Sequence, residues 1–404
     1  FDMVARWLRA SGLDVDYVRN ITDIDDKIIR RAQENGESIR TLTDRFIAAM
    51  NEDAAALGVL PPDHEPRATD YVPHMQSLIA RLEQKGLAYV AANRDVCYAV
   101  RKFEAYGKLS GKSVDELRAG ERVDVAQGKN DPLDFVLWKH AKAEEPGEVR
   151  WDSPWGAGRP GWHIECSAMC MRYLGETIDI HAGGEDLVFP HHENEIAQSE
   201  ASTGKAFVRY WLHAKHLLVN GEKMSKSRGN FLTLRDLLDK GHDPMAIRLA
   251  LMSVHYRASL NFTLDGLKEA REIIEKFDNC YSQCLSRLQL AAPGAGSELD
   301  LKGALEEIGT DLAEDLNVAS ALATLQKAVT EINAHLAQLS VTGLAGCVEF
   351  FRAVDRVFGF DIAAVAGIPA DVKMVLSDYV EARKAKDFAR SDALRKQIAD
   401  QGWL

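Results

Sequence analysis

The hydrophobic pattern of this chain changes after Asn230, and that change constrains the fold more than any other feature. Before Asn230, short apolar runs typical of strands alternate with longer segments whose apolar residues recur at helical spacing. After Asn230, the apolar repeats are almost all helical, through residues 263–290, 301–339 and 345–358. We therefore predict an α/β half with a parallel sheet, followed by an all-α half.

The α/β half contains an interruption. A strand is expected over Leu13–Ile21, followed by three helices that each end at glycine, over Asp25–Gly36, Arg40–Gly58 and Asp70–Gly86. Between Leu87 and Trp151 the pattern changes to short strands joined by loops rich in Gly, Lys and Asp, which predicts a small inserted domain. Alternation then resumes with a helix that ends at Leu174, a strand over 178–181, a helix over 187–202 and a strand over 210–219. This order predicts a parallel sheet that the insertion divides.

Composition narrows the class of protein. A chain of 404 residues can bury more than one core, so we expect two or three domains. No apolar run approaches the roughly 20 residues that span a bilayer, and no secretory signal is recognisable, so the cytoplasm is the expected compartment. The net charge of −12 argues against non-specific binding to nucleic acid, although basic clusters occur at 27–31, 223–228 and 383–396. Six cysteines without a regular framework favour reduced thiols or metal ligands over disulfides.

Residues 219–227, Val-Asn-Gly-Glu-Lys-Met-Ser-Lys-Ser, have the composition of a polyphosphate-binding loop. Lys223 and Lys226 supply mobile positive charge, and the serine hydroxyls and backbone N–H groups supply neutral donors. Gly221 and Gly229 allow the backbone to bend. A solvated turn is the alternative interpretation, and five residues alone do not decide between the two.

A second group of residues has the chemistry of a zinc site. His191 and Glu195 stand four residues apart, so they face the same side of one helix, and Cys166 could add a thiolate. Three such ligands would leave a tetrahedral zinc ion one open position or a fourth ligand elsewhere. Competing ligands are His192, Cys170 and His163. From spacing alone, an ordinary helix pair beside a core cysteine is the simpler explanation.

Five sequence blocks, taken together in this order, carry a family resemblance. They are Tyr17–Lys27, Asp134–Lys139, Ser153–Met169, Phe189–Ser199 and Lys223–Ser227. With these blocks the chain resembles the cysteinyl-tRNA synthetases, which are class I aminoacyl-tRNA synthetases, over essentially all of its length.

The resemblance implies a Rossmann-type parallel-sheet catalytic domain with a small inserted domain, followed by an all-α helical anticodon-binding domain. The implied bounds are 1–86 for the first part of the catalytic domain, 87–151 for the connective insertion, 152–229 for the second part of the catalytic domain, 230–265 for a stem-contact region, 266–370 for the anticodon-binding domain and 371–404 for a C-terminal module. The resemblance also implies a first strand, a His-Ile-Gly-His signature that contacts ATP and a fourth zinc-binding cysteine, none of which is in this sequence. Because Phe1 lies inside a helical pattern, we expect these to precede it.

The resemblance also implies a reaction in two steps. Cysteine would attack the α-phosphate of ATP, bound with Mg²⁺, to give cysteinyl adenylate, and the acyl group would then pass to the 3′-terminal ribose of tRNA. Lys226, assisted by Lys223, would bind the phosphates and stabilise the developing pyrophosphate. Gly184 and Asp186 would contact the ribose of the nucleotide.

For the amino acid, the resemblance implies that Cys166, His191 and Glu195 bind one zinc ion per chain. The zinc ion would take the substrate thiol as thiolate, which serine cannot match, so no editing site would be needed. The residues implied to line the cysteine pocket are Trp162, Thr22, His163, His181 and His192.

The expected partner is the cysteine-specific tRNA, and family members are commonly monomeric, so we expect a monomer. A paralogous ligase that joins cysteine to an amino sugar in mycothiol synthesis shares the zinc site and the lysine loop. The stretch Val380–Arg395 resembles the terminal module of the tRNA enzyme and therefore favours that enzyme. A non-catalytic protein that binds zinc and RNA is a third possibility, which an ATP signature upstream of Phe1 would exclude.

Overall fold

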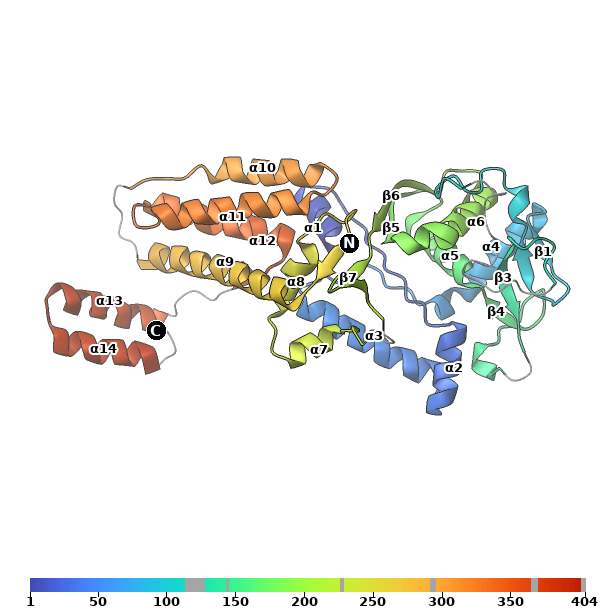
Figure 1. The fold of residues 1–404 in the computed structure, drawn as a ribbon, viewed down its shortest axis with the longest axis horizontal. Helices are drawn as coiled ribbons and strands as arrows, with labels where there is room; N and C mark the ends of the chain where they lie inside the picture. Colours follow the sequence, from blue (N-terminus) through green and yellow to red (C-terminus); the bar gives the residue numbers. More distant parts are fainter. Residues whose placement is uncertain (113–127, 143–144, 226–228, 291–295, 365–369, 401–404) are drawn as a thin grey trace. The chain divides into compact units, whose positions relative to one another are not determined.

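A computed structural model describes residues 1–112, 128–142, 145–225, 229–290, 296–364 and 370–400 of the chain. The chain forms two compact units (Figure 1). The first contains Phe1, residues 14–55 and residues 60–216, and the second contains residues 2–13, 56–59 and 217–404. In the described ranges, every helix is too short or too polar to span a bilayer.

The first unit contains five of the predicted helices. They are α2 (Asp26–Asn35), α3 (Ile39–Ala56), α4 (Val72–Gln84), α5 (Trp162–Leu174) and α6 (Glu193–Thr203). α2 begins where the backbone N–H of Lys27 donates to the Asp25 carboxylate at 2.7 Å. It ends at Gly36, whose φ of 67° is a left-handed conformation that glycine adopts at little cost. These local signals explain why the predicted and observed ends of α2 agree.

A four-stranded antiparallel sheet takes three strands from the predicted insertion, residues 87–151, and its fourth strand from beyond it. Its strands pair in the order β1 (Ala88–Val90), β2 (Val96–Tyr98), β3 (Phe135–His140) and β4 (Gly158–Pro160). Leu137 and Trp138 of β3 are completely buried and share one core with Ile164 of α5 and Ala197 of α6. The sheet is therefore joined to the surrounding helices through a common core.

A parallel pair of strands follows the insertion, as the alternating pattern predicts. β5 (Ile178–Gly184) and β6 (Val208–Ala214) are connected through α6, with Ile178 opposite Val208 and Gly184 opposite Ala214. The predicted helix over 187–202 begins only at Glu193, because residues 185–192 form the short turns η4 (Glu185–Leu187) and η5 (Val188–His192). Within η5, Phe189 has an extended backbone, which prevents one continuous helix.

The prediction of a strand over Leu13–Ile21 is wrong. In the described structure this segment forms isolated bridges, at Val18 and Ile21, with residues 64 and 67. The facing segment contains Pro66, which has no N–H to donate, so a continuous ladder cannot form there.

The strand predicted over 210–219 is interrupted. It divides into β6, which ends at Ala214, and β7 (Leu217–Val219) in the second unit. β7 pairs in parallel with β9 (Leu260–Phe262) and antiparallel with β8 (Glu222–Lys223).

The rest of the second unit is helical, as predicted. Its helices are α1 (Asp2–Ala10), α7 (Leu234–Asp239), α8 (Pro244–Met252), α9 (Leu264–Leu290), α10 (Leu301–Ala313), α11 (Val318–His335), α12 (Val341–Phe358), α13 (Ala370–Lys384) and α14 (Phe388–Asp400). α9 to α12 lie side by side around a core that includes Phe277, Leu325 and Phe351, and α13 and α14 pack against each other as a hairpin (Figure 1). The bounds of the six segments implied by the family resemblance stay a prediction.

Candidate active site and metal centre

The structure brings Cys166, His191 and Glu195 together in the first unit. All three side chains are buried, and their ligand atoms lie within 4.8 Å of one another. Cys166 comes from α5, His191 from the end of η5 and Glu195 from the first turn of α6. The Nε2 atom of His191 lies 3.0 Å from Oε1 of Glu195. Two helices and a turn thus converge on one point.

The donor set fits a zinc ion. Thiolate sulfur, imidazole nitrogen and carboxylate oxygen are the ligands that zinc takes in proteins. Among the described residues, Oε1 of Glu195 is buried without a hydrogen bond of acceptable geometry, which leaves a lone pair for a cation. Burial of an acceptor in this way is costly unless something is bound to it.

A second group of candidate ligands shares Glu195. Among the described residues, His181, His192 and Glu195 also place their ligand atoms within 4.8 Å of one another. His181 lies on β5, and its Nε2 atom is 3.0 Å from Oε2 of Glu195. Of the competing ligands, His192 belongs to this second group, His163 is hydrogen-bonded to His191, and Cys170 lies one turn after Cys166 on α5, outside both groups.

Charge and burial set the protonation of this cluster. Burial works to raise the pKa of Glu195, but the His181 and His191 imidazoles outweigh it and hold the pKa well below its usual range. Burial, and then the nearby Glu195 carboxylate, raise the pKa of the Cys166 thiol far above its usual range. Burial also lowers the pKa of His163 and of His192 to about 3, so both rings are neutral at pH 7. A cation that binds here must therefore displace the thiol proton of Cys166.

The predicted pocket residues surround this cluster to different extents. The ring centroid of Trp162 lies 4.3 Å from that of His191, and 46% of Trp162 is exposed. Thr22 is half-buried, two residues after Asn20, whose Nδ2 atom lies 3.6 Å from Sγ of Cys166. Asn20 is thus a further contact of the cluster, which the ligand spacing does not predict.

Trp211 and His213 on β6 were also missed. Nε2 of His213 lies 2.7 Å from Nδ1 of His192, and the Trp211 ring lies 5.0 Å from the rings of both His181 and His192. Trp211 and His213 are two residues apart on a strand, so they share a face. This two-residue alternation is the feature of the sequence that indicates their shared position.

The Gly-Gly pair at the end of β5 is required by close packing. A Cβ atom on Gly183 would lie 2.8 Å from Cε1 of His192, and one on Gly184 would lie 2.5 Å from Oδ1 of Asp186. Glycine therefore lets the strand end approach the histidine cluster and lets Asp186 fold back over it.

The lysine loop belongs to the second unit. Lys223 ends β8, after a turn in which Asn220 and Gly221 both have positive φ, of 51° and 79°. Asn230 bridges the loop, since it accepts from the N–H of Ser225 at 2.8 Å and donates to the carbonyl of Lys223 at 3.2 Å. Lys226 lies outside the described residues.

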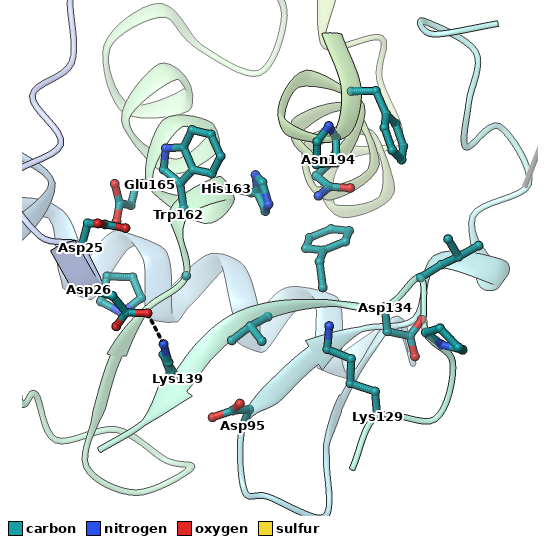
Figure 2. A pocket seen from close by; sticks show the side chains of 18 of the residues that line it. Asp25, Asp26, Asp95, Lys129, Asp134, Lys139, Trp162, His163, Glu165 and Asn194 are labelled. Atoms are coloured by element: carbon teal, nitrogen blue, oxygen red, sulfur yellow. Dashed lines mark hydrogen bonds and ion pairs between the residues drawn. The ribbon is translucent and has the colours of Figure 1, made fainter. Parts of the chain in front are cut away.

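A cavity of about 1230 Å³ opens in the first unit beside the histidine cluster (Figure 2). The insertion sheet, the Asp25–Lys27 segment and the start of α5 line it. Its side chains include Lys129, Lys139, Arg159, Trp162, Glu165 and Asn194. Burial, with Asp23 and Asp25 nearby, raises the pKa of Glu165 well above its usual range.

Comparison with known proteins identifies the class. A family model described as the tRNA synthetases class I (C) catalytic domain matches residues 1–272. The cysteine--tRNA ligase of Aromatoleum aromaticum is 54% identical over 413 residues, which cover all of this chain and 87% of that protein. That of Herminiimonas arsenicoxydans is 52% identical and covers all of this chain and 86% of its own length.

Solved structures show the same fold at low identity. The Mycobacterium tuberculosis methionyl-tRNA synthetase bound to methionyl-adenylate has a TM-score of 0.63 at 15% identity, over 90% of this chain and 85% of that one. The LeuRS of Agrobacterium radiobacter K84, in a ternary complex with tRNA and LeuAMS, has a TM-score of 0.65 at 13% identity, over 91% and 82%. These likenesses confirm the Rossmann-type α/β fold.

Fold and site together define a class I aminoacyl-tRNA synthetase. Within that class, the chain belongs to the cysteine--tRNA ligases, the cysteinyl-tRNA synthetase family. The predicted family is confirmed, and the amino-sugar ligase is not favoured.

Proposed function

We propose that this chain activates L-cysteine with ATP and Mg²⁺ to cysteinyl adenylate and transfers the cysteinyl group to the 3′-terminal ribose of its tRNA. The observation that carries this proposal is the buried set of Cys166, His191 and Glu195 in a class I synthetase fold. A thiol-recognising ligand set is what an enzyme selective for cysteine needs. Full sequence coverage by relatives named for that reaction supports the same conclusion.

Cys166, His191 and Glu195 would hold one zinc ion. When bound, zinc supplies a preference for thiolate sulfur over a hydroxyl group, which separates cysteine from serine at the binding step. The ionised Glu195, whose charge is supported by His181, would keep the local charge favourable for a cation. Trp162, which lies against His191, would close the amino-acid pocket on that side.

The other residues of the first unit would position substrate. His163, His181, His192 and Thr22 would line the amino-acid pocket, with His163 and His192 as neutral rings that hydrogen-bond without adding charge. Gly184 would leave room for the nucleotide ribose, and Asp186 would accept from its hydroxyl groups. Positioning of this kind provides much of the rate in a reaction between two bound substrates.

Lys226 and Lys223 would bind the phosphates of ATP. A lysine ammonium neutralises the charge that develops on pyrophosphate as the α-phosphate is attacked. Asn230, through its bonds to Ser225 and Lys223, would fix the shape of the loop before ATP binds.

The second unit would bind tRNA. Basic side chains near its end would contact phosphates, at Arg383, Lys384, Lys386, Arg390, Arg395 and Lys396. The acidic total charge would then confine RNA binding to local basic faces. The α9 to α12 bundle is proposed to read the anticodon, and the protein is proposed to act as a monomer.

Charging of total tRNA by the full-length protein tests the proposal. Labelled cysteine should become attached to tRNA in an ATP-dependent reaction, and labelled serine should not. Cysteine-dependent exchange of pyrophosphate into ATP, measured in parallel, reports the first step alone. Absence of both activities in folded, zinc-loaded protein would overturn the proposed function.

A further inference from the structure

The turn from which the lysine loop starts is held by a side chain that the proposed reaction does not use. The Oδ1 atom of Asn261, on β9, accepts a hydrogen bond from the backbone N–H of Gly221 at 2.6 Å. The N–H of the neighbouring Asn220 donates to the carbonyl of Phe262 at 3.1 Å. One strand, β9, therefore accepts from both central residues of the turn.

The hairpin cannot fix these two N–H groups by itself. Asn220 and Gly221 have φ of 51° and 79°, as a two-residue type I′ turn requires, and Val219 pairs with Glu222 on either side of them. The N–H groups of the two central residues stand outside that ladder. Both residues are exposed, so water could accept from them as well. What the bond to Asn261 adds is a fixed position for the turn.

A fixed position matters because the strand after the turn is short. β8 contains only Glu222 and Lys223, and in the described part of the chain it pairs with β7 alone. Two residue pairs hold an isolated hairpin poorly in water. Leu218 lies opposite both Asn261 on β9 and Lys223 on β8, so the three residues form one row across the sheet. Anchoring the turn to β9 therefore also limits how far Lys223 can move.

Lys223 is thus held on both sides along the chain. After it, Nδ2 of Asn230 donates to its carbonyl at 3.2 Å, and before it, Asn261 holds the turn through Gly221. We propose that Asn261 is a positioning residue for amino-acid activation, which holds the turn so that Lys223 meets the phosphates of ATP. This inference rests on the proposed function, in which Lys223 binds those phosphates.

The test compares Asn261→Ala with the wild type in cysteine-dependent pyrophosphate exchange by the full-length enzyme. Loss of one neutral hydrogen bond should lower kcat/KM for ATP about three- to tenfold. The KM for cysteine and the melting temperature should not change, because the bond is exposed and is no part of the proposed amino-acid pocket. Asn261→Asp keeps an acceptor oxygen and should recover most of the exchange at about 0.15 M salt, where its added charge is largely screened.

A double-mutant cycle shows whether Asn261 acts through Lys223. If it does, Asn261→Ala should cost little in a Lys223→Ala background, since the group that it positions is already absent. Hydrogen exchange gives a readout that needs no substrate, because the Gly221 amide should exchange faster in Asn261→Ala than in the wild type. Asn333→Ala removes an exposed asparagine of α11 and, as the matched control, should behave as the wild type in every measurement.

The inference is overturned if Asn261→Ala exchanges pyrophosphate as the wild type does, or if its loss persists in full without Lys223. It is also overturned if Asn261→Asp is no better than Asn261→Ala. Failure of the proposed function would look different, because the wild type itself would then show no cysteine-dependent exchange.

Discussion

The Nδ1 atoms of His163 and His191 lie 2.9 Å apart in a buried hydrogen bond. One ring must donate and the other accept, so each fixes the tautomer of its partner. If His191 binds zinc through Nε2, its Nδ1–H donates to His163. Removing such a partner from a ligating histidine weakens metal binding about 10- to 100-fold. We expect this loss for His163→Ala, measured by competition with a coloured chelator. His74→Ala, at an exposed position of α4, is the control, and equal affinity in the two variants would contradict the prediction.

Zinc content should depend on Cys166 and not on Cys170. Both thiols lie on α5, one turn apart, but only Cys166 joins a candidate ligand group among the described residues. Metal analysis of purified protein should find about one zinc per chain in the wild type and in Cys170→Ala. Cys166→Ala should retain little. Equal zinc in the two cysteine variants would remove Cys166 from the site.

Lys226→Ala should depress cysteine activation strongly. Loss of a charge that stabilises the transition state typically costs about 100-fold or more in rate. Because the residue would act on phosphates, binding of cysteine should change little. Pyrophosphate exchange and cysteine titration measure the two effects, with Lys240→Ala as a control. Unchanged exchange would exclude Lys226 from the mechanism.

Asp278→Asn should stabilise the second unit at neutral pH. Burial, with Asp243, Asp355 and other acidic neighbours, raises the pKa of Asp278 to about 6 from 3.8. An acid whose pKa is higher in the folded state costs no stability below pH 3.8, and the cost grows as pH rises towards 6. The variant should therefore gain about 1 kcal/mol at pH 7.5, after allowance for partial solvent screening, and nothing near pH 3.5.

Urea denaturation at the two pH values checks this prediction. Glu272→Gln, an exposed neutralisation on the same helix, should change little at either pH. A destabilising effect of Asp278→Asn at pH 7.5 would show that the carboxylate makes a favourable contact instead.

Arg248→Met should destabilise the second unit severely. The Arg248 side chain is 4% exposed and donates to the carbonyl of Phe358 at 2.7 Å, to that of Leu57 at 3.0 Å and to the Asp2 carboxylate. Its loss removes one donor from each of these three acceptors and an opposite charge from Asp2, at a cost of about 3 to 5 kcal/mol. Arg257→Met removes an exposed ion pair with Asp315 and should cost about 1 kcal/mol or less. Thermal melting of the two variants should separate them clearly.

Local signals in the sequence were sufficient for most helices. The Asp25 cap and Gly36 specify the ends of α2, and Gly204 and Gly359, at φ of 76° and 63°, end α6 and α12 in the same way. The strand predicted over 13–21 failed because pairing depends on the partner segment, where Pro66 interrupts the ladder. Apolar alternation alone does not contain that information.

Sequence motifs were sufficient to predict the candidate ligands of the site, but not the residues that pack around them. His191 and Glu195 are neighbours by helix geometry, whereas their approach to Cys166 depends on how α5 packs against α6. The burial of Glu165 could not be predicted, because its neighbours Asp23, Asp25 and Arg159 come from segments far from it in the sequence or outside α5. Trp211 and His213 could have been found from their two-residue spacing on a strand.

Hydrogen bonds connect the insertion to α6, the helix that carries Glu195. Tyr98 donates to the carbonyl of Ala197 at 3.0 Å, Tyr106 donates to Asn194, and the Glu193 carboxylate accepts from the N–H of Ser110 at 2.9 Å. Exchanging insertions between related synthetases to alter tRNA preference would therefore disturb amino-acid recognition as well. A grafted insertion that keeps Tyr98, Tyr106 and their acceptors on α6 should leave amino-acid recognition undisturbed. These hydrogen bonds are therefore the contacts to preserve when the insertion is exchanged.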